Sequence, residues 1–184
     1  MRQTLVFALA LTVGLFAGCS TGESPEAKSM KAELQKSAGE KTAVAANLAE
    51  FDTLDYVVFT NQEWTRLHES HAPNIKVYWP DGHSTEGIDV HIQDLKAMFV
   101  YAPDTRITQH PIRFGSGNYT AVTGVFEGTF TKPMPAGNGK LIQPTGKAFS
   151  MPMATIGVWE NGVMTEEHLF WDNQTYMKQI GLMK

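Results

Sequence analysis

The chain has 184 residues, of which 42% are hydrophobic and 18% are charged, and its formal net charge is −4. This length and composition fit one globular domain and leave little room for a second. The negative charge disfavours a nucleic-acid-binding protein whose affinity comes from phosphate contacts. A single cysteine excludes an intrachain disulfide and zinc sites built from several cysteines. No apolar run reaches the roughly 18 residues that indicate a membrane-spanning helix.

Residues 1–18 have the layout of a secretory signal peptide. Arg2 precedes a short apolar run, and the small residues Ala17 and Gly18 stand directly before the lone cysteine, Cys19. This arrangement resembles a bacterial lipobox, in which cleavage leaves cysteine at the new N-terminus and lipid is attached to its sulfur. The resemblance implies a protein of the cell envelope that is lipid-anchored to a membrane through Cys19.

Two other interpretations of this segment are open, an ordinary secretory signal with an incidental cysteine and a buried N-terminal helix. Phe16 also stands where such motifs usually carry leucine. Ser20, rather than an aspartate, follows the cysteine. In lipoproteins of Gram-negative bacteria, that resembles an address for the outer membrane, facing the periplasm.

Residues 19–43 are predicted to be the lipidated cysteine and a tether. The segment has few apolar residues and mixed charges, which favours a flexible linker with a helical piece between Glu26 and Ser37. The pattern changes at Val44, so the folded domain is expected over residues 44–184.

Apolar spacing predicts the first elements of the domain. In chain order these are a helix over 44–58, a short helix over 64–71, a strand over 75–79 and a helix over 88–99. Pro80, Asp81 and Gly82 indicate the turn after the first strand.

The second half of the domain is predicted to be mostly strands. They cover residues 105–114, 119–131, 148–160 and 163–171, with a loop over 132–147 and a short closing helix that ends at Gly181. Asn161 and Gly162 favour a tight hairpin turn. Gly124 and Gly128 share one strand face, which suggests a bend or a close approach by another element.

This order of elements predicts an α+β fold, with a cone-shaped, strongly curved antiparallel sheet wrapped over about three N-terminal helices. Such a cone has an apolar interior that can hold a small molecule.

Several short motifs give the domain a family resemblance. They are Tyr78-Trp79-Pro80-Asp81-Gly82 followed by Gly87 and a helix, Pro103-Asp104 after that helix, and the run from Glu166 to Asp172 followed by Gln179-Ile180-Gly181. In order and spacing, these motifs resemble the SnoaL-like polyketide cyclases of the nuclear transport factor 2-like superfamily. The resemblance covers roughly residues 44–184.

The resemblance implies a cone-shaped α+β barrel, often a homodimer through its sheet. It also implies cyclases that use acid–base chemistry without metal or organic cofactor, alongside epoxide hydrolases, isomerases and non-catalytic binding proteins. The chain departs from the pattern in Asn74, where members often carry aspartate, and in its long loop over 132–147. The catalytic aspartate of the cyclases does not map onto one residue of this chain.

Asp172, His168 and His110 are the catalytic candidates. A carboxylate at the apolar end of a pocket can acquire a raised pKa and move protons, but Asp172 is equally suited to cap the last helix. His168 shares a strand face with Asp172, Phe170 and Glu166. If the opposite face lines the pocket instead, Trp171 and Leu169 form the wall and Glu167 is its only titratable group. His110 lies before Pro111 and could face either way.

The apolar residues expected to line the ligand pocket are Trp79, Tyr101, Phe126, Phe130, Met151, Met153 and Trp171. A plain hydrophobic core is the alternative for most of them. His68 and His71 could share a helical face that binds a metal, but they lack the zinc-protease spacing and no third ligand lies near in sequence, so no metal site is predicted.

The sequence therefore predicts a lipid-anchored SnoaL-like domain that binds a small apolar or carbonyl-bearing molecule and catalyses cofactor-free cyclisation, isomerisation or hydrolysis. The alternative is a non-catalytic small-molecule-binding or protein-interaction module at the cell envelope. The partners expected are a small-molecule ligand, the membrane through the lipid anchor and a second copy of the chain, with no nucleic acid.

Overall fold

The structure is a computed structural model that describes residues 23–184. The predicted signal peptide and Cys19 lie outside the described residues. Residues Lys36–Lys184 form one compact unit. Within the described part of the chain, none of the helices combines the length and the apolar character needed to cross a membrane.

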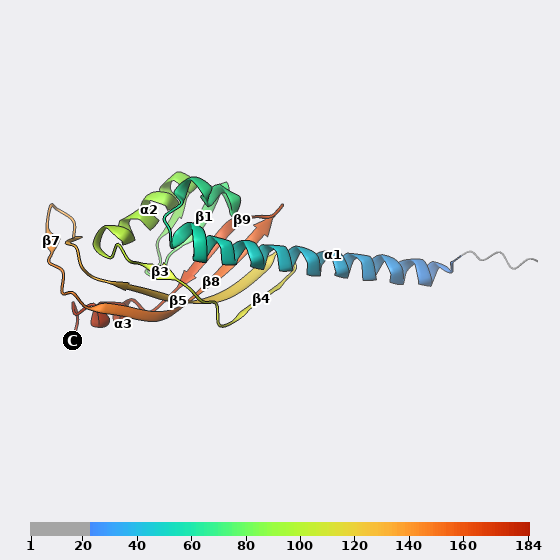
Figure 1. Cartoon of the computed structure of the whole chain (residues 1–184). Coiled ribbons are helices and arrows are strands. Elements are labelled where there is room, and N and C mark those ends of the chain that lie inside the picture. Colours follow the sequence, from blue (N-terminus) through green and yellow to red (C-terminus); the bar gives the residue numbers. More distant parts are fainter. Residues whose placement is uncertain (1–22) are drawn as a thin grey trace, which may run out of the picture. The chain divides into compact units, whose positions relative to one another are not determined.

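The predicted tether is largely helical. Helix α1 (Pro25–Thr53) runs without a break through the segment where the sequence predicted a flexible linker with one helical piece (Figure 1). Its alanine, glutamate, lysine and glutamine residues have high intrinsic helix propensity, which explains a helix with few buried side chains. Only its last turns carry buried residues, Asn47 and Phe51.

The chain leaves α1 through two short helices. A π-helix, η1 (Leu54–Phe59), buries Leu54, Asp55, Val58 and Phe59, and a 3₁₀ helix, η2 (Trp64–Glu69), follows. Strand β1 (His71–Tyr78) then begins four residues earlier than predicted. The predicted helical pair of His68 and His71 is therefore wrong, because His68 lies on η2 and His71 opens the strand.

Strand β2 (Ser84–Glu86) and helix α2 (Ile88–Tyr101) come next. The predicted strand over 105–114 consists of two pieces, β3 (Arg106–Ile107) and β4 (Arg113–Ser116). The long strands are β5 (Tyr119–Thr129), β8 (Ala148–Glu160) and β9 (Val163–Phe170), and helix α3 (Asn173–Gln179) closes the chain. The predicted loop contains a small two-stranded ladder, β6 (Met134–Pro135) with β7 (Leu141–Ile142).

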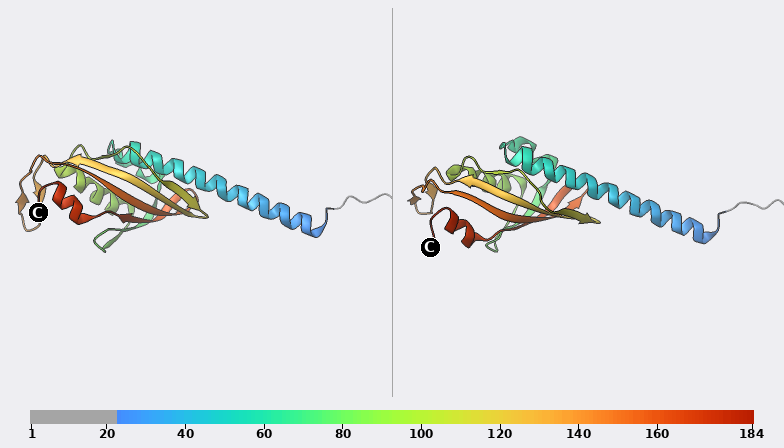
Figure 2. Two further views of the ribbon diagram at one scale, coloured as in Figure 1. Left: turned by 90° about the horizontal axis from the view of Figure 1, so that it is seen from below. Right: turned by 60° about the horizontal axis from the view of Figure 1, so that its bottom comes forward.

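The main sheet has the order β2-β1-β9-β8-β5-β3, and β4 also pairs with β5. All pairs are antiparallel except β1 with β9, which run parallel. The turn between β8 and β9 has positive φ at both Asn161 and Gly162, which confirms the predicted hairpin. Figure 2 shows the curved long strands with helix α2 behind them in the view from below. The α+β prediction is confirmed.

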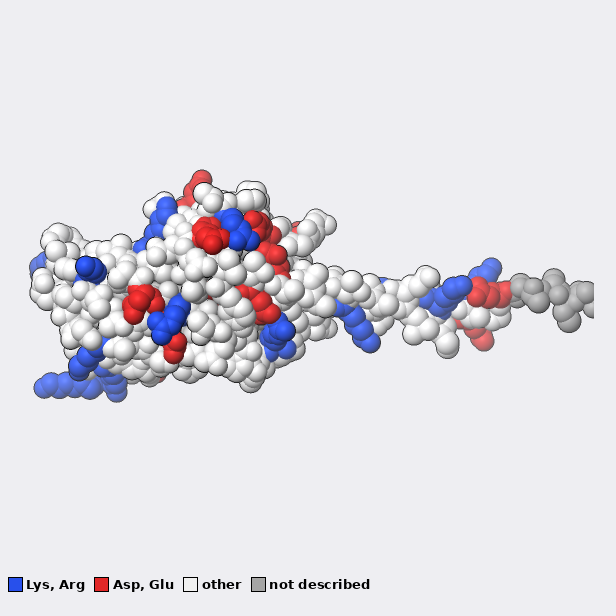
Figure 3. Space-filling view, viewed as in Figure 1, with Lys and Arg blue, Asp and Glu red and all other residues white. Residues whose placement is uncertain are grey.

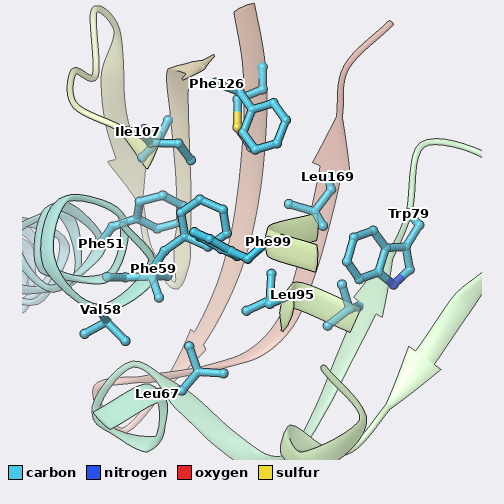
Figure 4. Packing of buried hydrophobic residues seen from close by; sticks show 14 of the residues in the cluster. Phe51, Val58, Phe59, Leu67, Trp79, Leu95, Phe99, Ile107, Phe126 and Leu169 are labelled. Atoms are coloured by element: carbon cyan, nitrogen blue, oxygen red, sulfur yellow. The ribbon is translucent and has the colours of Figure 1, made fainter. Parts of the chain in front are cut away.

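The hydrophobic core lies between the inner face of the sheet and helices η1 and α2 (Figure 4). Along β5 and β8, buried residues alternate with more exposed ones, as expected for a sheet with one covered face. A Cβ atom at Gly128 would lie 2.6 Å from Cζ of Phe149, so the predicted close approach at this glycine is confirmed.

Charged side chains form small mixed groups on the surface. On the face shown in Figure 3, acidic and basic residues lie side by side rather than in one basic patch. Arg66, for example, contacts Glu63 at 2.6 Å and Glu69 at 2.9 Å.

Candidate functional site

The face of β9 that points inward is the one with Glu167 and Leu169. Both side chains are buried, whereas Phe170 on the opposite face is exposed. His168 stacks on Tyr78 with ring centroids 4.3 Å apart, and its Nε2 lies 3.3 Å from Oε2 of Glu166. The second of the two sequence alternatives is therefore realised, and His168 lies on the outer face of the sheet.

Asp172 caps helix α3. Its carboxylate accepts hydrogen bonds from Oγ1 of Thr175 at 2.6 Å and from the backbone N–H of Gln174 at 2.9 Å. Both hydrogen bonds lower the pKa of Asp172 below its ordinary value, and the one from Thr175 has the larger effect. The side chain is exposed and does not line the internal cavity described next. The structure thus shows the capping role that the sequence left open, and a catalytic role for Asp172 remains a prediction.

A small internal cavity lies between the sheet and the helices. Its volume is about 40 Å³, which is room for a few water molecules. Most of its lining is apolar, and the polar residues in it are Asp55, His71, His91, Thr155 and Glu167. A guest larger than a few atoms would require the walls to move.

Only part of the predicted pocket lines this cavity. Phe126, Met153 and Trp171 are in the lining. The other four predicted residues pack elsewhere in the core or at its edge: Trp79, Tyr101, Phe130 and Met151. Tyr101, for instance, meets Phe130 edge to face and accepts a hydrogen bond from the hydroxyl of Tyr176 at 3.1 Å. The plain-core alternative therefore holds for these four side chains.

The first polar cluster in the cavity wall consists of His71, His91 and Glu167, here called the His-His-Glu cluster. Its members come from the start of β1, the first turn of α2 and the inner face of β9. Oε2 of Glu167 lies 3.2 Å from Nε2 of His91 and 3.6 Å from Nε2 of His71. Burial opposes ionisation of Glu167, but the two facing imidazoles outweigh it and hold the pKa of this carboxyl well below 4.5.

The second polar cluster joins the cavity to the protein surface. His110 bridges two carboxylates: its Nε2 lies 2.8 Å from Oδ2 of Asp55, and its Nδ1 lies 2.8 Å from Oδ1 of Asp52. Asp52 also pairs with the half-exposed Arg113. Asp55 sits in the π-helix and is 9% exposed. Burial raises the pKa of Asp55 above its ordinary value of 3.8, although the hydrogen bond with His110 acts in the opposite direction.

Sequence reasoning identified His110 but not its carboxylate partners. It also missed His91, and it named Glu167 only as part of one alternative. Asp55 and His110 are 55 residues apart, so no local spacing could connect them. The one available signal was the acidic pair Asp52 and Asp55 inside an apolar helical pattern, because a carboxylate on such a face needs a buried partner.

Comparison with known proteins identifies the family of this domain. A family model described as SnoaL-like polyketide cyclase matches residues 52–180. None of the curated proteins compared is significantly similar to the chain in sequence.

Solved structures of the same fold are similar over nearly their whole length. A proposed SnoaL-like polyketide cyclase from Jannaschia is 17% identical, with a TM-score of 0.66 over 77% of this chain and 95% of that one. Another proposed polyketide cyclase, from Streptomyces antibioticus, is 21% identical, with a TM-score of 0.63 over 73% of this chain and 98% of that one. At these identities, the likeness concerns the fold.

Proposed function

Because this chain belongs to the SnoaL-like polyketide cyclase family, we propose that it binds a small carbonyl-bearing molecule in its internal cavity and transfers a proton on it. The observation that carries this proposal is Asp55, a buried carboxyl group in an apolar cavity wall that is held by His110 at 2.8 Å. No organic cofactor is needed for such chemistry.

Asp55 would act as the general base. A buried carboxylate with a raised pKa is a stronger base than an exposed one, and it suits abstraction of a proton next to a carbonyl group. The hydrogen bond from His110 engages only Oδ2 of this carboxyl. His110 and Asp52 thus position Asp55, while the His-His-Glu cluster offers the polar part of the wall at which the carbonyl oxygen would lie.

Exchange of α-protons tests this proposal without knowledge of the natural substrate. Acetone, the smallest ketone, is incubated with the protein in D₂O, and loss of its α-proton signal is followed by NMR, because a cavity of about 40 Å³ admits only a guest of a few atoms. The wild-type protein should accelerate the exchange, and Asp55→Asn should reduce that acceleration at least about 100-fold, since a positioned base contributes roughly 10²–10⁴-fold. The rate should rise with pH as Asp55 ionises, with a midpoint above 3.8 because burial raises its pKa.

The same experiment is carried out with Asp172→Asn, which tests the alternative catalytic residue. Loss of exchange in this variant, with a normal rate in Asp55→Asn, would move the catalytic role to the residue first favoured from the sequence. A wild-type protein that gives no exchange above the buffer rate would contradict proton transfer. It would leave the alternative of a non-catalytic small-molecule-binding or protein-interaction module. Native mass spectrometry of co-purified ligand would then identify the guest.

The proposal places the domain at the cell envelope, anchored by lipid on Cys19. Support comes from the pattern Ala17-Gly18-Cys19 after a short apolar run. When the full chain is expressed in a Gram-negative host, mass spectrometry should find a mature N-terminus that starts at an acylated Cys19. Cys19→Ser should stay unprocessed and carry no lipid. An unmodified Cys19 in the mature protein would contradict the anchor.

The homodimer implied by the family resemblance belongs to the same proposal. Ile156 and Phe170 are exposed on the outer face of the sheet, where a second copy would pack.

A further inference from the structure

The His-His-Glu cluster brings together residues from distant parts of the chain. Parallel pairing sets Glu167 opposite Val77 of β1, the strand that begins at His71. Gly87, with a φ of 99°, turns the chain into α2 and accepts the backbone hydrogen bond of His91 at 3.0 Å. The exposed side-chain fractions of His71, His91 and Glu167 are 0%, 2% and 7%. Three ionisable groups are thus withdrawn from water into one wall of the cavity.

The three side chains are close together but not satisfied by one another. Nε2 of His71 and Oε2 of Glu167 are buried and have no hydrogen-bond partner in the described part of the chain. Oε2 of Glu167 lies within 3.6 Å of Nε2 of both histidines. The geometry of these contacts does not meet that of a hydrogen bond, so Oε2 is left without a partner. Burying such polar atoms without a partner is costly, which points to a further species between them.

Ser70 fixes which nitrogen of His71 faces the cluster. The hydroxyl of Ser70 donates to the carbonyl oxygen of Leu67 at 3.3 Å, and its oxygen lies 2.9 Å from Nδ1 of His71. With the serine proton directed at Leu67, Nδ1 of His71 would be the donor to Ser70. Nε2 is then the nitrogen that is free to bind an ion. A hydrogen bond of this kind on the far ring nitrogen is what orients metal-binding histidines.

The two distances from Glu167 are close to the edge length of a tetrahedral metal site. Two bonds of 2.0–2.1 Å at the tetrahedral angle place their ligand atoms about 3.3–3.4 Å apart. The two distances from Oε2 of Glu167, 3.2 and 3.6 Å, lie on either side of that value. Among the described residues, these are the three whose ligand atoms lie within 4.8 Å of one another.

We infer that His71, His91 and Glu167 bind one divalent transition-metal ion, with zinc the best match, and that its fourth position opens into the cavity. Two imidazoles and one carboxylate suit zinc, whereas magnesium and calcium prefer more numerous oxygen ligands. Three protein ligands with one open position are typical of catalytic rather than structural zinc. All three residues line the cavity, so the open position faces a bound guest.

This inference goes beyond the proposed function and does not depend on it. Metal binding is measured without any substrate, whereas proton transfer by Asp55 is measured by exchange. If both hold, the ion would polarise a carbonyl oxygen held at the same wall.

Metal binding is tested by titrating the chelator-stripped protein with zinc in competition with a chromophoric chelator. One equivalent should bind, and Glu167→Gln and His91→Asn should each weaken the affinity at least about 100-fold, because each removes one of three ligands. Exposed histidines provide matched controls: His68→Asn and His83→Asn should bind zinc as the wild type does. Magnesium should not compete.

A spectroscopic measurement keeps the inference testable if a ligand variant folds poorly. Cobalt(II) added to the wild-type protein should give the intense visible absorption of tetrahedral coordination, and zinc should displace it. Asp55→Asn should bind zinc normally even where it abolishes exchange, so the two proposals can fail separately. Zinc binding that survives in Glu167→Gln, or that disappears in His83→Asn, would overturn the site.

Discussion

Replacing His91 with leucine should lower the free energy of unfolding by up to about 3–5 kcal/mol, the cost typical of removing one partner of a buried charge. Glu167 is 5% exposed, and Nε2 of His91 is the nearer of its two imidazole neighbours, at 3.2 Å. Leucine fills much of the imidazole volume, so the loss would come from the carboxylate and not from an empty space. Urea unfolding of the metal-free protein, followed by circular dichroism, measures the change.

A second histidine–glutamate pair on the same strand serves as the control. His168 and Glu166 lie 3.3 Å apart, but their side chains are 32% and 43% exposed. His168→Leu should therefore cost at most about 1 kcal/mol, as surface pairs do. The double variant His91→Leu with Glu167→Leu should recover much of the stability, because it removes the charge as well. Equal losses in the single and double variants would show that Glu167 is not a buried charge in need of pairing.

The strands of the second half of the domain could be predicted because their patterns are local. Alternation of buried and exposed residues along β5 and β8, and the Asn161-Gly162 turn, require no knowledge of the rest of the fold. The first half was less predictable. The π-helix at Leu54–Phe59 continues a helical pattern, and only its position over the sheet shows that Asp55 faces the cavity.

The candidate site could be predicted only as a set of alternatives. Strand parity correctly separates Glu167, Leu169 and Trp171 from Glu166, His168 and Phe170, but each set contains apolar and ionisable residues. Parity alone therefore cannot show which set is buried. The buried set is identified only by the packing of α2, because its His91 lies next to Glu167 in the core.

Long-range pairing also explains why the polar clusters were missed. His71 was assigned to a helix because it follows Leu67 and His68 at helical spacing. In the structure, β1 pairs with β9 in parallel, with a register shift between His71 and Lys76. The parallel neighbour of β1 lies about ninety positions further along the chain, so the sequence of β1 itself does not indicate this pairing. The ionisable residues of the cavity thus become visible as a site only when the sheet is assembled.

Phe126→Ala should also lower the free energy of unfolding by about 3–5 kcal/mol, the usual cost of truncating a buried phenylalanine. The ring is 7% exposed and lies against Phe149 at 5.1 Å and Trp171 at 6.2 Å between ring centroids. Phe126 lines the cavity, so its removal enlarges the space available to a guest. Thermal unfolding with and without an apolar probe such as benzene measures both effects.

The probe decides whether this interior is a binding site or only a core. At a concentration about 100 times its dissociation constant, a guest of the enlarged cavity should restore about 2.7 kcal/mol to the variant. The wild-type protein should gain much less, because a cavity of about 40 Å³ has no room for a benzene ring. Phe114→Ala, at a side chain that is 63% exposed, should change neither stability nor probe response. A Phe126→Ala protein that is destabilised but gains nothing from the probe would show that the walls collapse into the vacated space. The domain would then need a large opening motion before it could accept a substrate.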